Sequence, residues 1–96
     1  MPTFIMLSTL TDDGAETVKA NPDRIREVRE ELEQQFGIRI VAQYAVLGPY
    51  DFVNIVEAPD IETVARVSAE MAARGSVKIQ TLAAIPVDEF IARLKT

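Results

Sequence analysis

Apolar residues follow two different periods along this chain of 96 residues. Four stretches are dense in β-branched and other large apolar side chains, which is typical of strands. Two longer stretches repeat their apolar residues every three or four positions, which predicts amphipathic helices. A short last helix is expected after Pro86. The expected strands are residues 3–10, 38–47, 52–58 and 77–85.

Turn and capping residues bound the two long helices. The first is expected to begin at Asn21, a good N-cap followed by Pro22, and to stop at Gly37. The second is expected to begin at Asp60, also an N-cap, and to stop at Gly75. The first apolar stripe is Ile25, Val28, Leu32 and Phe36, and the second is Ile61, Val64, Ala65, Ser68, Met71 and Ala72. The last helix would have an inner face of Val87, Phe90, Ile91 and Leu94.

The resulting order is β-α-β-β-α-β-α, with no more than one short helical turn expected at 11–14. Right-handed crossovers and an antiparallel hairpin between the second and third strands leave few ways to pack this order. The economical arrangement is a four-stranded antiparallel sheet with both long helices on one face. The sequence therefore predicts an α+β fold with a single domain over residues 1–96.

The second face of the sheet has no helix to cover it. If the hairpin places Val46 opposite Phe52, Tyr44 lies opposite Asn54 and shares this open face with it, while Val53 and Ile55 lie under the helices. Such a face is too apolar for bare solvent, so we expect two copies to stack across a two-fold axis as a homodimer or larger oligomer. The alternative is a cavity for a small ligand, either between the helices and the sheet or within a barrel of two copies, lined by Tyr44, Tyr50, Asn54 and Ser8.

The turn Gly48-Pro49-Tyr50-Asp51 joins the two hairpin strands and adds an aromatic residue and a carboxylate that a turn does not require. Tyr50 could donate a hydrogen bond to a ligand, and Asp51 could orient that ligand or act as a base. Alternatively, Asp51 accepts hydrogen bonds from backbone donors within the turn, and Tyr50 packs on a neighbouring chain. The candidate ligand-binding residues are thus Tyr44, Tyr50, Asp51 and Asn54, and no catalytic residue is identified.

Composition excludes several kinds of site. The chain has no cysteine and no histidine, so it lacks thiolate chemistry and the usual ligands of transition metals. We expect no metal and no cofactor, because no phosphate-binding or cofactor motif is present. The acidic residues at 12, 13 and 16 are expected to be solvated charges. A net charge of −5 argues against nucleic-acid binding, and the absence of a long apolar run or signal peptide argues for a cytoplasmic protein without membrane contact.

The hairpin turn also carries a family resemblance. The run from Leu47 to Asp60, LGPYDFVNIVEAPD, resembles the signature of the GYD-domain family of small bacterial and archaeal proteins, named for a Gly-x-Tyr-Asp motif. The opening Met1-Pro2-Thr3-Phe4-Ile5 and the later Thr81-Leu82 are similar to the same family. Pro49 stands where relatives often carry a polar or basic residue, so no role for a charge carries over there. The resemblance implies a ferredoxin-like domain that pairs into a dimeric α/β barrel, and it implies no particular reaction.

Two classes of function remain. The first is a self-assembling module that binds a small molecule or a partner protein without converting it. The second is a cofactor-free enzyme, similar to oxygenases or isomerases, that uses Tyr50 and Asp51 in a pocket of the barrel. The second class rests on analogy of fold. An enclosed pocket with a perturbed Asp or Tyr would favour it.

Overall fold

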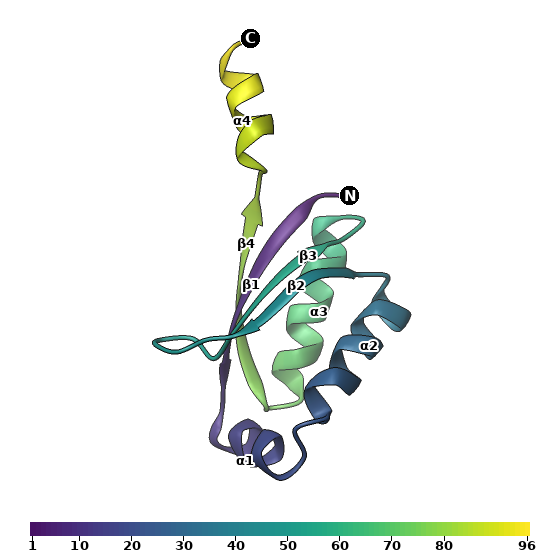
Figure 1. Cartoon of the computed structure of the whole chain (residues 1–96). Coiled ribbons are helices and arrows are strands. Elements are labelled where there is room, and N and C mark those ends of the chain that lie inside the picture. The colour runs from purple at the N-terminus through teal and green to yellow at the C-terminus, as the bar shows by residue number, and fades with distance from the viewer.

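The computed structural model describes residues 1–96, which form four strands and four helices (Figure 1). In chain order the elements are β1 (Thr3–Leu10), α1 (Asp12–Ala20), α2 (Arg24–Phe36), β2 (Arg39–Ala45), β3 (Phe52–Glu57), α3 (Ile61–Ala73), β4 (Val77–Ala84) and α4 (Val87–Leu94). The strands form one antiparallel sheet in the order β2-β3-β1-β4. Helices α2 and α3 lie side by side on one face of this sheet (Figure 1).

The predicted α+β fold with a four-stranded antiparallel sheet is therefore confirmed, and the strand order is compatible with a ferredoxin-like arrangement. The sheet is open, with β2 and β4 as its edges. Arg39, Lys78 and Gln80 lie on these edge strands. Charged side chains at a sheet edge oppose pairing with the edge of another sheet.

The caps of the helices agree only partly with the sequence prediction. Asp60 caps α3, since its carboxylate accepts hydrogen bonds from the Thr63 backbone N–H and hydroxyl, both at 2.7 Å. Gly37 ends α2 in the left-handed conformation, with φ of +66°. The expected start at Asn21 is wrong, because α2 begins at Arg24 after Asp23. Asn21 instead ends α1 by donating its backbone N–H to the carbonyl of Thr17 at 2.8 Å.

Helix α1 is nine residues long, so the expectation of one short turn is also wrong. Thr11 caps this helix by accepting a hydrogen bond from the Gly14 backbone N–H at 3.1 Å. The Thr11 hydroxyl donates to the carbonyl of Gly75 at 2.6 Å, and its backbone N–H donates to the carbonyl of Ser76 at 3.0 Å. Gly14 is buried against Ser76. The start of α1 is thus tied to the turn that follows α3.

The hairpin register differs from the expected one by a single residue. Ala45 lies opposite Phe52, and Val46 closes the hairpin through a 2.9 Å hydrogen bond to the carbonyl of Asp51. A shift of one residue moves every side chain of a strand to the other face of the sheet. Contrary to the prediction, residues 52, 54 and 56 of β3 face the helices, while 53 and 55 occupy the open face.

The core lies between the sheet and the two long helices. Its fully buried apolar residues come from β1, β3, α3 and the two segments that lead into β2 and α3. Residues of α2 pack against this cluster but remain half-buried. The buried cluster is Phe4, Met6, Ile38, Val56, Ala58, Val64, Val67 and Met71.

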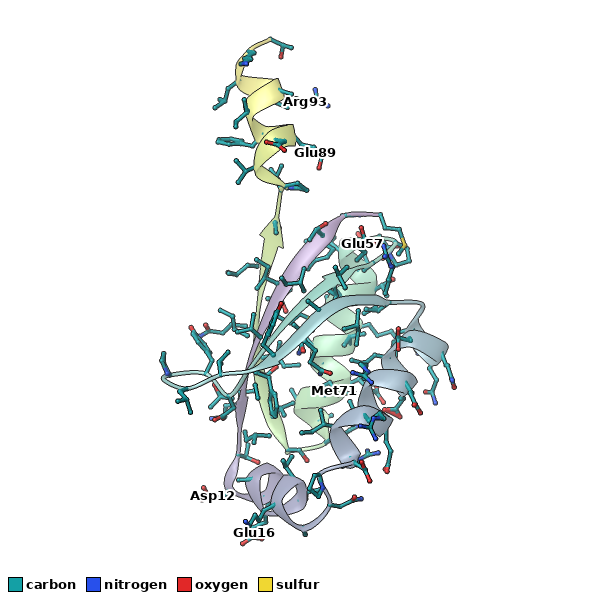
Figure 2. The ribbon with its side chains drawn as sticks, viewed as in Figure 1. Asp12, Glu16, Glu57, Met71, Glu89 and Arg93 are labelled. Atoms are coloured by element: carbon teal, nitrogen blue, oxygen red, sulfur yellow. The ribbon has the colours of Figure 1, made fainter.

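Helix α4 extends away from the body of the domain beyond β4, and the molecule is consequently 52 Å long and 19 Å thick (Figure 1). Its side chains, including Glu89 and Arg93, stand clear of the other elements (Figure 2). The expected inner face of α4 therefore has no surface of its own chain to cover. The exposed fractions of Phe90 and Leu94 are 50% and 70%.

Candidate functional site

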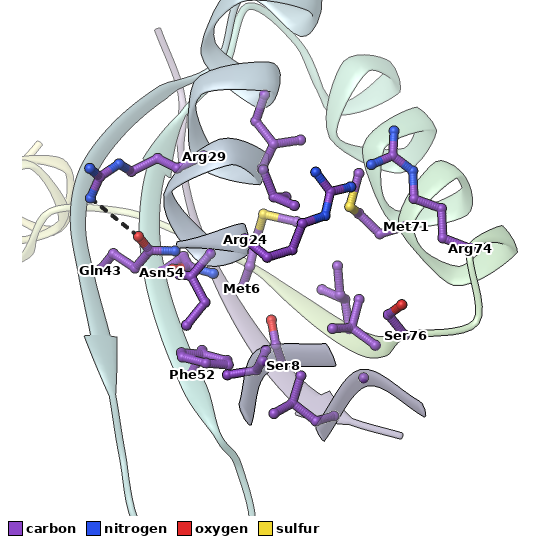
Figure 3. A pocket seen from close by; sticks show the side chains of 18 of the residues that line it. Met6, Ser8, Arg24, Arg29, Gln43, Phe52, Asn54, Met71, Arg74 and Ser76 are labelled. Atoms are coloured by element: carbon purple, nitrogen blue, oxygen red, sulfur yellow. Dashed lines mark hydrogen bonds between the residues drawn. The ribbon is translucent and has the colours of Figure 1, made fainter. Parts of the chain in front are cut away.

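A cavity of about 140 Å³ lies between the helix side of the sheet and helices α1, α2 and α3 (Figure 3). Met6 and Ile79 contribute part of its apolar sheet-side wall, and Val28 and Leu32 contribute part of its helix-side wall. The lining also includes the exposed residue Arg74, so the cavity opens to solvent at the end of α3.

Two polar side chains of the sheet face this cavity without a partner in the chain. Asn54 on β3 lines it, and its buried Oδ1 atom accepts no hydrogen bond. Ser8 on β1 also lines it and is only 5% exposed. Its hydroxyl forms no hydrogen bond within the chain, although its backbone carbonyl accepts one from Asp51. Buried polar groups in native proteins are nearly always paired, so the unpaired Asn54 oxygen is unusual.

Three guanidinium groups lie on the helix side of the cavity (Figure 3). Arg74 forms two hydrogen bonds with Glu31, at 2.6 and 3.0 Å, and these bonds hold the pKa of Glu31 below its ordinary value. Arg24 is 3.8 Å from the nearest carboxylate oxygen, of Glu27. Arg29 has no carboxylate within ion-pair distance and makes only a long hydrogen bond, 3.5 Å, to Gln43. No aspartate or glutamate lines the cavity.

The four candidate ligand-binding residues that were identified from the sequence do not lie together in the structure. Tyr44 lies opposite Val53 on the open face and is 59% exposed, whereas Asn54 lies opposite Gln43 and faces the cavity. The expectation that Tyr44 and Asn54 share one face is therefore wrong, because the register is shifted by one residue.

Tyr50 and Asp51 both make hydrogen bonds within the fold. The Tyr50 hydroxyl donates to Gln80 Oε1 on β4 at 2.8 Å. Asp51 Oδ2 accepts from the Leu10 backbone N–H at 2.8 Å, and the Asp51 backbone N–H donates to the carbonyl of Ser8 at 2.8 Å. The turn is thus fastened to β1 and β4, and Asp51 satisfies a backbone donor on another strand rather than one within the turn.

The open face of the sheet is more apolar than the sequence indicated. Ile5 lies between Ile55 and Leu82 in one row across three strands, and Leu7 lies next to Val53 in the neighbouring row. Leu82 is 50% exposed. Together with the apolar stripe of α4, this face is a second candidate surface. We call these two parts the open face and the α4 stripe.

Ser8 and Asn54 were expected from the sequence as residues of a ligand cavity, whereas the arginines and Gln43 of this cavity were not. The charged residues of α2 looked like an ordinary solvated helix surface, and nothing in their spacing distinguishes Arg24 and Arg29 from Arg26. Only the packing of α1 against the end of α3 shows which of them border a cavity. No helix is long and apolar enough to cross a bilayer.

Comparison with known proteins gives a family, one full-length relative and one structural neighbour. The family profile described as GYD domain matches residues 4–94. A protein of Thermus thermophilus named "Glutamine synthetase and cystathionine beta-lyase binding protein" is 70% identical over 95 residues, which are 99% of this chain and 100% of that protein. The crystal structure of MtbAldR is similar in fold, with a TM-score of 0.65 at 19% identity. The match covers 88% of this chain and 52% of that chain.

Proposed function

The chain belongs to the GYD-domain family, and from this premise we propose that it is an accessory module that binds other proteins and itself and does not catalyse a reaction. The observation that carries the proposal is the 70% identity, over the whole length of both chains, with a protein named for binding two enzymes. The partners proposed for this chain are accordingly glutamine synthetase and cystathionine β-lyase.

Self-association is the second part of the proposal. The open face and the α4 stripe are apolar surfaces of the same chain, and α4 projects too far to cover its own sheet (Figure 1). A stable dimer buries about 800 Å² per partner. Helix α4 is only about 12 Å long and supplies too little of that area, so the open face has to take part. We therefore assign both surfaces to a second copy of the chain, in the two-fold arrangement of a dimeric α/β barrel.

The enzymatic alternative has no observation in its favour. It requires Tyr50 and Asp51 to be available to a substrate, yet both side chains hydrogen-bond within the fold. Asp51 occupies one of its carboxylate oxygens with a backbone donor of β1.

A binding measurement with the purified enzymes tests the first part. The intact chain is immobilised, and glutamine synthetase and cystathionine β-lyase from the same organism are passed over it separately. Saturable, reversible binding of each enzyme is expected, whereas an unrelated oligomeric enzyme of similar charge is not retained. If neither enzyme binds the intact chain, the proposed function is wrong.

A pair of variants on α4 tests the second part. Ile91→Asp places a charge in the middle of the α4 stripe, while Ala92→Asp places the same charge on the opposite side of the helix. Sedimentation equilibrium is expected to show a dimer or larger assembly for the wild type and Ala92→Asp, and a smaller species for Ile91→Asp. A wild type that sediments as a 10.6 kDa monomer at micromolar concentration would refute self-association.

A further inference from the structure

The cavity under the helices contains hydrogen-bonding groups that the chain itself leaves unused. Asn54 presents a buried carbonyl oxygen without a donor, and Ser8 presents a hydroxyl without any partner, although only 5% of this residue is exposed. These two side chains come from neighbouring strands, β3 and β1, and both line the same cavity. An enclosed polar group of this kind is normally satisfied by protein, water or a ligand.

The volume and walls of the cavity suit an apolar body of defined size. About 140 Å³ is close to the roughly 150 Å³ of an engineered apolar cavity that binds benzene. Met6, Phe52 and Ile79 form part of the wall on the sheet side. A purely apolar guest would leave the Asn54 oxygen unpaired, so the guest also needs an O–H or N–H group.

The helix side of the cavity supplies positive charge. Arg24 and Arg29 both border the cavity, but they are five positions apart along α2 and therefore lie on different sides of the helix. Arg24 makes only a 3.8 Å ion pair with Glu27, whereas the Arg29 side chain reaches Gln43 on β2 (Figure 3). Arg74 is neutralised by Glu31 and adds little. Since no acidic side chain lines the cavity, an anion gains attraction there and a cation does not. Guanidinium groups bind carboxylates through paired hydrogen bonds.

We infer that this cavity binds a small organic carboxylate with an apolar body about the size of a benzene ring and one hydrogen-bond donor. The apolar body fills the space between α2 and the sheet. The donor pairs with Asn54 Oδ1, Ser8 provides a further hydrogen bond, and the carboxylate meets Arg24. This small-molecule site is separate from the open face and the α4 stripe, which we proposed for self-association.

Three probe compounds separate the contributions of the hydrogen-bond donor and of the carboxylate to binding. 4-Hydroxybenzoate has the ring, the donor and the carboxylate; benzoate lacks the donor; and methyl 4-hydroxybenzoate lacks the charge. Each is titrated into the ¹⁵N-labelled chain at millimolar concentrations, and amide chemical shifts are followed by NMR. Saturable shifts are expected for amides of β1, β3 and α2 around the cavity. 4-Hydroxybenzoate should bind roughly tenfold more tightly than either of the other probes, which is about the loss expected when one hydrogen bond is removed.

Matched variants locate the binding. Arg24→Gln removes a guanidinium from the cavity, whereas Arg26→Gln removes one from the exposed side of the same helix. Ser8→Ala removes the cavity hydroxyl, and Thr9→Ala removes the next hydroxyl of β1, which lies on the opposite side of the strand. Arg24→Gln and Ser8→Ala are expected to weaken 4-hydroxybenzoate binding several-fold, and the two controls are expected to leave it unchanged.

Several results would overturn the inference. The first is the absence of saturable shifts with all three probes, which would mean that water alone occupies the cavity. Equal affinity for the three probes, or equal effects of Arg24→Gln and Arg26→Gln, would show that the contacts are not those named here. Binding of the two enzymes is measured without any probe, so the protein-binding proposal and the carboxylate site fail independently.

Discussion

Replacing Gly14 by alanine tests how closely α1 is packed against the turn after α3. Within a helix, glycine is less favourable than alanine by roughly 1 kcal/mol, so this change would ordinarily stabilise the chain. Here a Cβ atom at Gly14 would overlap the carbonyl oxygen of Ser76 and lie 2.9 Å from its carbonyl carbon. Both atoms belong to the backbone, so no rotamer change relieves the contact. The start of α1 has to move away from Ser76.

The expected loss of stability follows from the contacts that this movement disrupts. Overpacking of this kind typically costs about 1–3 kcal/mol. The displacement also loosens the hydrogen bonds from Thr11 to Ser76 and Gly75, each worth about 1 kcal/mol. The gain in helix propensity offsets about 1 kcal/mol. We therefore expect Gly14→Ala to lower the free energy of unfolding by about 1–3 kcal/mol, or the melting temperature by very roughly 4–20 °C for a domain of this size.

Urea unfolding followed by circular dichroism measures this change, at one fixed protein concentration because an assembly gains stability with concentration. Glu16→Ala is the matched control, since it lies on the exposed side of α1 and touches nothing at Ser76. Its free energy of unfolding should match that of the wild type within about 0.5 kcal/mol. A Gly14→Ala variant that is more stable than the wild type would refute the close approach of α1 to Ser76.

Leu32→Ala is expected to lower the free energy of unfolding in urea by about 2 kcal/mol. This is the low end of the range for a leucine, because Leu32 is half-buried. An unchanged urea midpoint would contradict the packing of Leu32 against the core. Asp51→Ala should lower the free energy of unfolding by about 1–3 kcal/mol, because it leaves the Leu10 N–H unpaired. Tyr50→Phe should lower it by less than about 1 kcal/mol. If neither variant changes the melting temperature, these two residues are not needed for the fold and are free for a ligand. The pKa of Glu31 is lowered in the folded chain by Arg74, so its contribution is present above the unfolded pKa and is lost as pH falls through the folded one. The stability of Glu31→Gln should accordingly fall less on acidification than that of the wild type, and parallel curves would argue against this ion pair. Elemental analysis is expected to find no stoichiometric transition metal, and one metal per chain retained through chelation would contradict this.

Local signals in the sequence predicted the ends of helices correctly where a single residue determines where the helix begins or ends. Asp60 and Gly37 were placed correctly because an N-cap and a left-handed glycine act through their own backbone neighbourhood. Helix α1 was missed because its stretch contains a single large apolar residue, Val18, and has no stripe. Thr11 followed by two aspartates was the available signal, since a threonine cap and acidic residues favour the start of a helix.

Non-local geometry was the part that the sequence could not supply. The register between β2 and β3 depends on how the turn closes, and both possible registers place apolar residues on both faces. The one-residue error moved Asn54 from the open face to the cavity and separated it from Tyr44. The cavity itself depends on where α1 packs, which is set by contacts between residues more than 60 positions apart in the chain.

Because α4 projects from the domain, the conformation of residues 87–94 is expected to depend on the concentration of the protein. An isolated helix of fewer than about 12–15 residues is only marginally stable in water, and α4 has eight. Its helical form therefore depends on a surface that covers Phe90 and Leu94, and under the self-association proposed above that surface belongs to a second copy of the chain. Dilution should unravel residues 87–94 before the rest of the domain is affected. Protease cleavage within this segment would then slow as the concentration rises, so that the tail itself reports how much of the protein is assembled.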